Sequence, residues 1–291
     1  MKSTKYLAYF GGTVLAIGAL FASCEKDDKL GESVLNVTPD ENKSDIDRWV
    51  DKEFRDLYNI RVFHKWNPYK VDIERYLTPP AEENVRPALD VVKGIWLDAY
   101  ATVADTLFVK ETAPRELVLT GSRNMNTNGT NTLGLAEQGY RISLFEVDAL
   151  QLKSEAAVKN FIHTIQHEYV HILNQRVHFD EQNYMAITSN AYRADWQNAS
   201  DAEAWSLGFI SNYARSNGKE DFAEQASWML RDIVEYNNKV NAISSVTGKE
   251  KIRKKEAMVV SYYDKAFGID FYELCKETRQ RTLDIVEAAN N

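Results

Sequence analysis

Residues 161–175 read FIHTIQHEYVHILNQ, and this stretch combines a helical pattern with three of the five histidines of the chain. From about Ser154 onward, apolar side chains recur at intervals of three and four, as on one face of an amphipathic α-helix. His163, His167 and His171 follow one another at intervals of four. The pattern therefore predicts one long helix with a histidine face beside its apolar face. The apolar positions are Val158, Phe161, Ile162, Ile165, Tyr169, Ile172 and Leu173.

The five residues 167–171, HEYVH, form an H-E-x-x-H motif within this helix. Imidazoles one turn apart have Cβ atoms about 5–6 Å from each other, so both rings can reach one small cation. Neutral imidazole suits Zn²⁺, with Zn–N bonds of about 2.0–2.1 Å. The motif predicts His167 and His171 as ligands and Glu168 as the base that takes a proton from an activated water and later returns it. The alternative is a helix whose histidines merely pack or form hydrogen bonds.

A catalytic zinc site needs a third protein ligand. His178 is a weak candidate, because the metzincin extension requires glycine at Asn174 and histidine at Val177. Cys275 is a lone thiol far downstream, and we expect it in the core. We expect His163 to form a hydrogen bond beside the metal site or in the core, and not to be a ligand.

Residues 220–224, EDFAE, supply the better candidates. Glu220 and Glu224 share one helical face a turn apart. One carboxylate can bind the metal while the other accepts the second ring N–H of a ligand histidine and fixes its orientation. The alternative is an ordinary acidic first turn, which the helix dipole favours.

The pairing of H-E-x-x-H with a later E-x-x-A-E resembles gluzincin metallopeptidases, including the anthrax lethal factor protease domain. The resemblance implies that Glu220 is the metal ligand and that Glu224 supports a ligand histidine. It also implies a catalytic role for Tyr213, seven residues before Glu220, in stabilising the transition state.

The chain further resembles the substrate import-associated zinc metallohydrolase lipoproteins of Bacteroidetes. The resemblance implies a zinc hydrolase in a nutrient-import setting, with a TonB-dependent transporter and its paired surface lipoprotein as partners, and leaves the substrate open. It rests on the lipoprotein signal and on residues 95–98 (IWLD), 132–137 (TLGLAE), 161–175, 208–215 (GFISNYAR) and 220–224.

The first 23 residues predict a cleaved export signal. Lys2 and Lys5 precede the uncharged residues 6–23, and the small residues before Cys24 resemble a bacterial lipobox. Cys24 is then the lipidated residue, with palmitate-like acyl chains holding the protein to a membrane. We expect a lipidated flexible tether over residues 24–45 and an outer-membrane location, exposed at the cell surface if the acidic residues 25–28 are an export tag. The alternatives are an uncleaved anchor helix and an ordinary acidic tether.

Composition and pattern predict the fold class of the remainder. The 291 residues are 44% hydrophobic and carry a formal charge of −8, which favours a globular domain and argues against a nucleic-acid partner. A capped helix should begin at Ser44 and a second one near Pro87, followed by strands over 106–109, 115–120 and 140–147. We expect an α+β fold over residues 46–291, a small mixed sheet followed by a mainly helical, gluzincin-like zincin domain. Residues 140–147 are a candidate edge strand for docking an extended peptide.

Three functions remain open on the sequence. The leading prediction is a zinc metallopeptidase acting on peptides or proteins. A zinc amidase acting on peptidoglycan or glycopeptides is the second. The third is a non-catalytic, metal-containing binding lipoprotein, which Glu168 disfavours because a structural site needs no carboxylate beside its first ligand.

Overall fold

A computed structural model describes residues 43–126, 131–137 and 139–291. The described residues from Ser44 onward belong to one unit. The predicted signal (1–23), Cys24 and nearly all of the predicted tether lie outside the described residues. Among the residues that are described, no helix is both long and apolar enough to cross a membrane.

The predicted capped helix at Ser44 is present. Helix α2 (Asp45–Val50) begins with a capping box, in which the Asp47 N–H donates to Ser44 Oγ and the Ser44 N–H donates to Asp47 Oδ2. The chain then continues through a π-helical segment, Asp51–Asp56.

The second helix begins earlier than predicted. Helix α3 (Glu82–Val91) has Pro87 in its interior, although the proline was expected at its start. Glu82 and Glu83 open the helix, where they complement the helix dipole. Pro87 cannot donate to the carbonyl one turn back, and the helix changes soon afterwards to a π-helical segment, Val92–Leu97.

The described strands form a four-stranded sheet in the order β1-β2-β6-β5. Strand β2 is parallel to β1 and β6, and β5 pairs antiparallel with β6, Gly134 opposite Leu144. The candidate docking strand at 140–147 is therefore interior, since β6 has a neighbour on each side, and that prediction is wrong. The edge strands of this sheet are β1 and β5, and β5 is the one beside β6. The strands are β1 (Arg61–Phe63), β2 (Glu116–Leu119), β5 (Gly134–Glu137) and β6 (Arg141–Leu144), beside a separate ribbon of β3 (Asn124–Met125) and β4 (Asn131–Thr132).

One predicted strand, at 106–109, is instead part of helix α5 (Thr106–Thr112). Its β-branched residues favour a strand, but Asp105 caps a helix here: the Phe108 N–H donates to Asp105 Oδ1 at 2.6 Å. A single cap outweighs the weak strand preference of a short segment.

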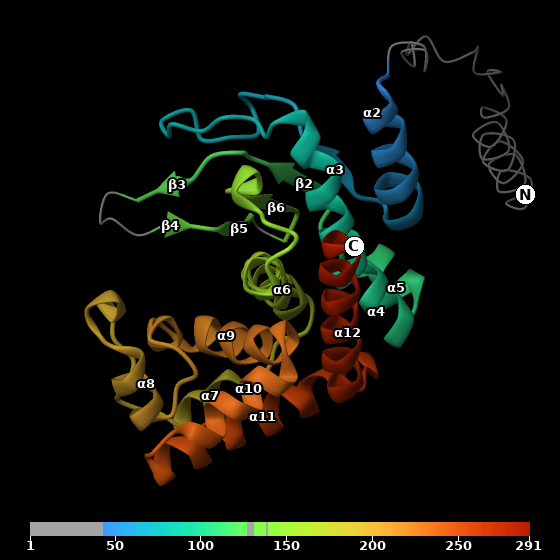
Figure 1. Ribbon diagram of the computed structural model, residues 1–291. Coiled ribbons are helices and arrows are strands. Elements are labelled where there is room, and N and C mark those ends of the chain that lie inside the picture. Colours follow the sequence, from blue (N-terminus) through green and yellow to red (C-terminus); the bar gives the residue numbers. More distant parts are fainter. Residues whose placement is uncertain (1–42, 127–130, 138) are drawn as a thin grey trace, which may run out of the picture. The chain divides into compact units, whose positions relative to one another are not determined.

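The long helix predicted from the histidine stretch is α6 (Glu155–Arg176), capped by Ser154. It lies between strands β5 and β6 on one side and α9 (Gly218–Arg231) on the other (Figure 1). Its apolar face is buried, and the Tyr169 ring meets Trp96 and Tyr100 edge-on at centroid distances of 5.0 Å. The fold is α+β and mainly helical after a small mixed sheet, as predicted.

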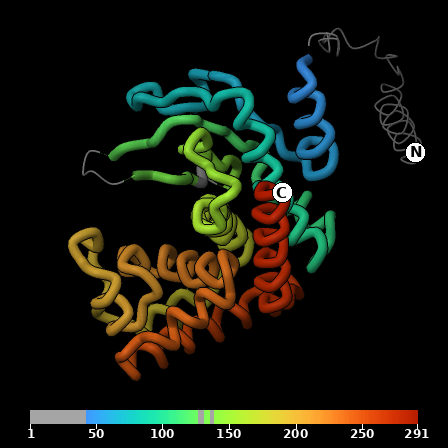
Figure 2. The backbone as a smooth tube through the Cα atoms, in the orientation of Figure 1, coloured from blue at the N-terminus to red at the C-terminus, as the bar shows by residue number. Residues whose placement is uncertain are grey.

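The C-terminal helices complete the domain around α6 and α9. The tube in Figure 2 shows the last helix, α12, returning to lie beside α4 from the first half of the described chain. The remaining helices are α4 (Asp98–Val103), α7 (Glu181–Ala186), α8 (Asp201–Leu207), α10 (Ile233–Ala242), α11 (Val246–Phe267) and α12 (Phe271–Asn290), with 3-10 turns at Val147–Ala149, Trp196–Asn198 and Tyr213–Arg215.

Candidate metal centre

The packing of α6 against α9 brings the predicted histidines and glutamates together. The i, i+4 spacing of His163, His167 and His171 sets all three on the side of α6 that faces α9. Asn217 caps α9: its side-chain oxygen Oδ1 accepts hydrogen bonds from the backbone N–H groups of Lys219 and Glu220, at 3.0 and 3.1 Å. This cap fixes the first turn of α9, and with it the position of Glu220.

Three donor atoms converge at the cleft end of this cluster. His167 Nε2 lies 2.9 Å from Glu220 Oε2 and 3.1 Å from His171 Nε2, and His171 Nε2 lies 3.2 Å from Glu220 Oε2. A tetrahedral zinc with bonds of 2.0–2.1 Å holds its ligand atoms roughly 3.3 Å apart. Two imidazole nitrogens and one carboxylate oxygen are also a common catalytic zinc set. The donor set therefore fits Zn²⁺ in both chemistry and spacing.

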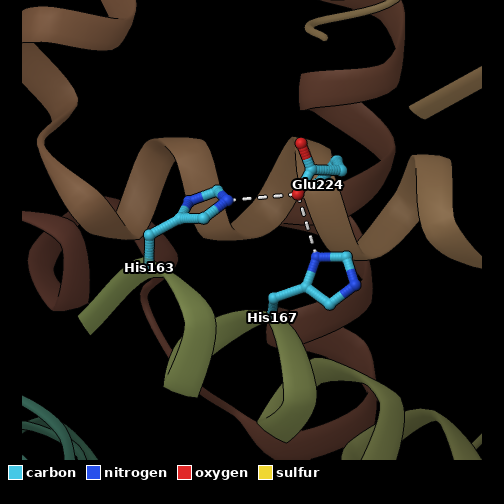
Figure 3. Close-up of side chains that lie close together, drawn as sticks. All are labelled: His163, His167 and Glu224. Atoms are coloured by element: carbon cyan, nitrogen blue, oxygen red, sulfur yellow. Dashed lines mark hydrogen bonds and ion pairs between the residues drawn. The ribbon is translucent and has the colours of Figure 1, made fainter. Parts of the chain in front are cut away.

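Glu224 occupies the other side of the His167 ring. Its Oε1 lies 3.0 Å from His167 Nδ1 and 3.1 Å from His163 Nε2, and Figure 3 shows both rings directed at this one oxygen. Its Oε2 accepts hydrogen bonds from Ser211 Oγ at 2.5 Å and Trp228 Nε1 at 3.3 Å. Glu224 is thus saturated by hydrogen bonds and can hold the His167 ring with Nε2 directed at Glu220.

Two groups in this cluster could hold an ion: His167, His171 and Glu220, or His163, His167 and Glu224. The first is the better candidate, because it borders the cleft described below and its carboxylate is not already engaged by Ser211 and Trp228. His163 accordingly lies beside Glu224 and outside the first donor set.

The charges of the cluster are strongly coupled. Burial lowers the pKa of His167, but hydrogen bonds to Glu220 and Glu224 outweigh this effect and raise it to about 10. Burial has the opposite effect on the carboxyls of Glu220 and Glu224, whose pKa it raises. The facing imidazoles outweigh this and hold both pKa values below the usual range for glutamate. Facing charges of opposite sign therefore stabilise the closely spaced donors in the metal-free protein.

A cleft of about 970 Å³ opens beside the donor atoms, and Glu168, His171, Tyr213 and Glu220 line it. The edge strand forms part of its wall: a Cβ added at Gly134 would lie 3.3 Å from Glu168 Cγ. Glycine at this position therefore lets β5 approach the helix beside the predicted base.

Tyr213 belongs to the 3-10 turn that precedes α9. Its ring centroid lies 5.8 Å from that of His167 and 4.8 Å from that of Trp196. Burial and the nearby Glu220 carboxylate raise the pKa of the Tyr213 hydroxyl above its ordinary value. The phenol is thus held in its protonated, hydrogen-bond-donating form beside the ligand pair.

The other candidates from the sequence lie elsewhere. His178 is in the cleft wall but in neither donor group. Cys275 is fully buried in the core, as expected, and burial raises the pKa of its thiol.

Several residues around the site were missed on the sequence. Trp228 follows Glu224 by one helical turn, so its spacing was a usable signal. Ser211 reaches Glu224 from a separate segment, and no local pattern indicates it. Cleft-wall residues contributed by the strands, by α7 and by the cap of α9 likewise depend on the tertiary fold, not on a motif. They include Thr132, Leu135, Glu181 and Asn217.

Comparison with known proteins agrees with this geometry. The sequence pattern of a family described as "Putative zinc-binding metallo-peptidase" matches residues 39–272. A solved structure described as a putative zinc-binding metallo-peptidase from Bacteroides caccae is similar, with 30% sequence identity and a TM-score of 0.71. The similarity covers 85% of this chain and 95% of that one. No curated protein matches the sequence.

The family description names zinc, in agreement with the Zn²⁺ predicted from H-E-x-x-H and with the donor set of His167, His171 and Glu220. The match spans most of the chain and includes both α6 and α9. The chain therefore belongs to this family of zinc-binding metallo-peptidases.

Proposed function

We propose that the protein is a gluzincin-type zinc metallopeptidase that hydrolyses peptide bonds in peptides or proteins. The observation that carries the proposal is the convergence of His167 Nε2, His171 Nε2 and Glu220 Oε2 within 3.2 Å, beside Glu168 and open to a cleft. A purely structural zinc site is usually closed by four protein ligands, whereas a catalytic one keeps a position open.

His167, His171 and Glu220 would hold the zinc, and Glu224 would keep the His167 ring in its ligand orientation. Zinc bound there supplies a Lewis acid for a carbonyl oxygen and lowers the pKa of a bound water towards about 7. The remaining steps belong to side chains of the protein.

Glu168 is the proposed proton carrier. It follows the ligand His167 directly and lines the cleft, so its carboxylate can take a proton from the attacking water. It then donates that proton to the amide nitrogen that leaves. One carboxylate thus serves first as base and then as acid.

Tyr213 and β5 are proposed to act on the substrate. The Tyr213 hydroxyl lines the cleft and would donate a hydrogen bond to the oxygen that gains negative charge, a contact worth up to about 2.7–4 kcal/mol at such sites. Strand β5 is a sheet edge at the same cleft, since Gly134 and Leu135 line it. An extended substrate can pair with this edge through main-chain hydrogen bonds.

Digestion of a proteome-derived peptide library by the zinc-loaded protein tests the proposal. We expect wild-type cleavage that a chelator abolishes, and a loss of about 10²–10⁴-fold in rate for Glu168→Gln with zinc content retained. Glu155→Gln, at the half-buried first residue of the same helix, is the matched control and should cleave like wild type. An absence of cleavage by wild type, or full activity in Glu168→Gln, would contradict the proposal.

We also propose that the protein is a Bacteroidetes outer-membrane lipoprotein, anchored through Cys24, that works beside a TonB-dependent transporter and its paired surface lipoprotein. This part rests on the sequence of residues 1–28 and on the family resemblance that the sequence carries. Metabolic labelling with a palmitate analogue tests the anchor: Cys24→Ala should lose the label and leave the membrane fraction. Co-purification of the transporter with the tagged protein tests the partner.

A further inference from the structure

We propose that Glu181 makes this site selective for peptides that carry a positive charge near the cleaved bond. The inference rests on the proposed peptidase function and names the substrate class of that same cleft. The positive group is either a lysine or arginine side chain or the free amino terminus of the peptide, since both present ammonium-like donors to a carboxylate.

Glu181 is the first residue of α7, is half-buried and lines the same cleft as Glu168 and Glu220. A Cβ added at Gly218 would lie 3.4 Å from Glu181 Oε1. Gly218 precedes the ligand Glu220 by two residues. The Glu181 carboxylate therefore lies close to the first turn of α9, the turn that carries Glu220.

The position of Glu181 is rigidly supported. Asp180 caps α7 by accepting the Asn183 N–H at 3.2 Å, and the Tyr184 hydroxyl donates to the Asp221 carbonyl at 3.2 Å. Phe179 stacks on Phe222 of α9 at a centroid distance of 4.1 Å. These contacts fix α7 against α9, so the distance between Glu181 and the zinc ligands is set by packed helices.

The charge of Glu181 has no partner within the described part of the protein, where its carboxylate forms neither an ion pair nor a hydrogen bond. The other two carboxylates of the cleft, Glu168 and Glu220, are already assigned to the chemistry. Lys219 also lines the cleft, but it is exposed, so its ammonium is hydrated and screened. A half-desolvated, unpaired carboxylate gains most from a cation that the substrate supplies.

The rest of the wall near Glu181 offers no competing charge of fixed sign. Asn174, Gln175 and Asn217 are neutral, and His178 is an exposed imidazole. The alternative is a purely structural role for Glu181. Its carboxylate lies close to the start of α9, where a negative charge complements the helix dipole. That role would change stability but not substrate preference, so the two can be separated.

The test compares cleavage of alanine-based peptides that differ only in one residue, lysine or glutamine, near the cleaved bond. For wild type we expect kcat/KM to favour lysine by about 10–100-fold, the range of one charge-assisted hydrogen bond. Glu181→Gln should bring this ratio close to one, and Glu181→Lys should reverse it, so that the glutamine peptide is cleaved better than the lysine peptide. Glu83→Gln, which removes an exposed charge from α3, should keep the wild-type ratio.

A second arm identifies the source of the positive charge. Each peptide is assayed with a free and with an acetylated amino terminus. If the terminus is recognised, acetylation lowers kcat/KM by the same factor and the lysine substitution has little effect. If the side chain is recognised, the reverse holds, and either result supports the role of Glu181.

Binding to an inactive protein separates this inference from the peptidase proposal. The fluorescein-labelled lysine peptide and its glutamine counterpart are titrated with zinc-loaded Glu168→Gln and with the Glu168→Gln/Glu181→Gln double variant. Tighter binding of the lysine peptide only when Glu181 is present upholds the inference even if wild type cleaves nothing. The inference is overturned if neither peptide binds, if neither the lysine side chain nor the free amino terminus strengthens binding or cleavage, or if the preference for either positive group survives in Glu181→Gln.

Discussion

Two glutamates buried to the same degree, Glu116 in the sheet and Glu224 in the metal centre, differ in what their partners can do. Glu116 is 4% exposed and accepts hydrogen bonds from Lys70, Arg141 and Tyr140, at 2.7, 2.9 and 3.1 Å respectively. Glu224 is 5% exposed and faces two imidazoles. Burial raises the pKa of both carboxyls, but their hydrogen-bond partners lower it by more, so both pKa values end below the usual range for glutamate.

The difference lies in the chemistry of the partners. Ammonium and guanidinium groups keep their protons at neutral pH and cannot bind a metal, so the Glu116 cluster is an ion-pair network that joins β2, β6 and the loop before α3. Imidazole titrates near neutrality, and its neutral form is a metal ligand. Burial and a lowered carboxyl pKa therefore do not distinguish the metal centre from a structural network. The distinguishing feature is a set of partners that can lose a proton and bind a metal, beside an open cleft.

Replacement of Glu116 by alanine should give the largest change in stability. Lys70 and Arg141 would lose their shared partner in a mostly buried position, and breaking such a network costs about 3–5 kcal/mol. We expect the free energy of unfolding in urea to fall by about 3 kcal/mol, because both cations are partly exposed. The folded variant should keep the zinc content of wild type; loss of zinc would mean that the two regions are not independent.

Replacement of the ligand Glu220 by glutamine should act on the metal. We expect zinc affinity to fall at least about 100-fold, beyond the usual effect of changes around a site. A competition titration against a chromophoric chelator measures this, with Glu155→Gln as the control for loss of one negative charge. Unchanged affinity would remove Glu220 from the ligand set.

Glu224→Gln should have a smaller effect on zinc affinity. Glutamine keeps the shape but is a weaker acceptor for the His167 ring, and changes to such supporting residues typically cost about 10–100-fold in affinity. Ser211→Ala removes a donor from the other Glu224 oxygen and should cost less. If Glu224→Gln weakened zinc binding as much as Glu220→Gln, Glu224 would itself be a ligand.

The smallest effect concerns the acid dependence of stability. Burial raises the pKa of Glu116, but the hydrogen bonds from Lys70 and Arg141 outweigh this effect and leave the folded pKa below the unfolded value of about 4.3. Its stabilisation is therefore present above pH 4.3 and is lost as the pH falls through the folded pKa. We expect wild type to lose stability below about pH 4.3 more steeply than Glu116→Gln, by at most about 1.4 kcal/mol per pH unit.

Urea unfolding of wild type and Glu116→Gln at several acidic pH values measures this difference in stability. Any contribution of zinc to stability is common to both proteins and cancels in the comparison. Parallel curves would show that the Glu116 network does not favour the charged carboxylate.

The parts of the fold that were predictable carry local signals. The Ser44 capping box and the apolar face of α6 are both encoded within a few residues, and the predicted helices follow. Residues 106–109 were misassigned because a cap at Asp105 outweighs weak strand preference. The edge position of β5 depends on the pairing order of distant strands, which periodicity alone cannot indicate.

The candidate site divides in the same way. The spacing of His167, Glu168 and His171 lies within one turn of one helix, so the sequence alone indicates their proximity. Glu220 and Glu224 lie on another helix, and family resemblance was needed to assign their roles. Ser211 lies between α8 and the 3-10 turn at Tyr213, and Glu181 lies on α7. Both reach the site only through tertiary packing, which no local pattern reports.

Diffraction at the zinc absorption edge from crystals of the zinc-loaded protein tests the central assignment most directly. We expect one anomalous peak within bonding distance of His167 Nε2, His171 Nε2 and Glu220 Oε2, on the cleft side of the His167 ring. A peak between His163, His167 Nδ1 and Glu224, or no peak at this cluster, would contradict it.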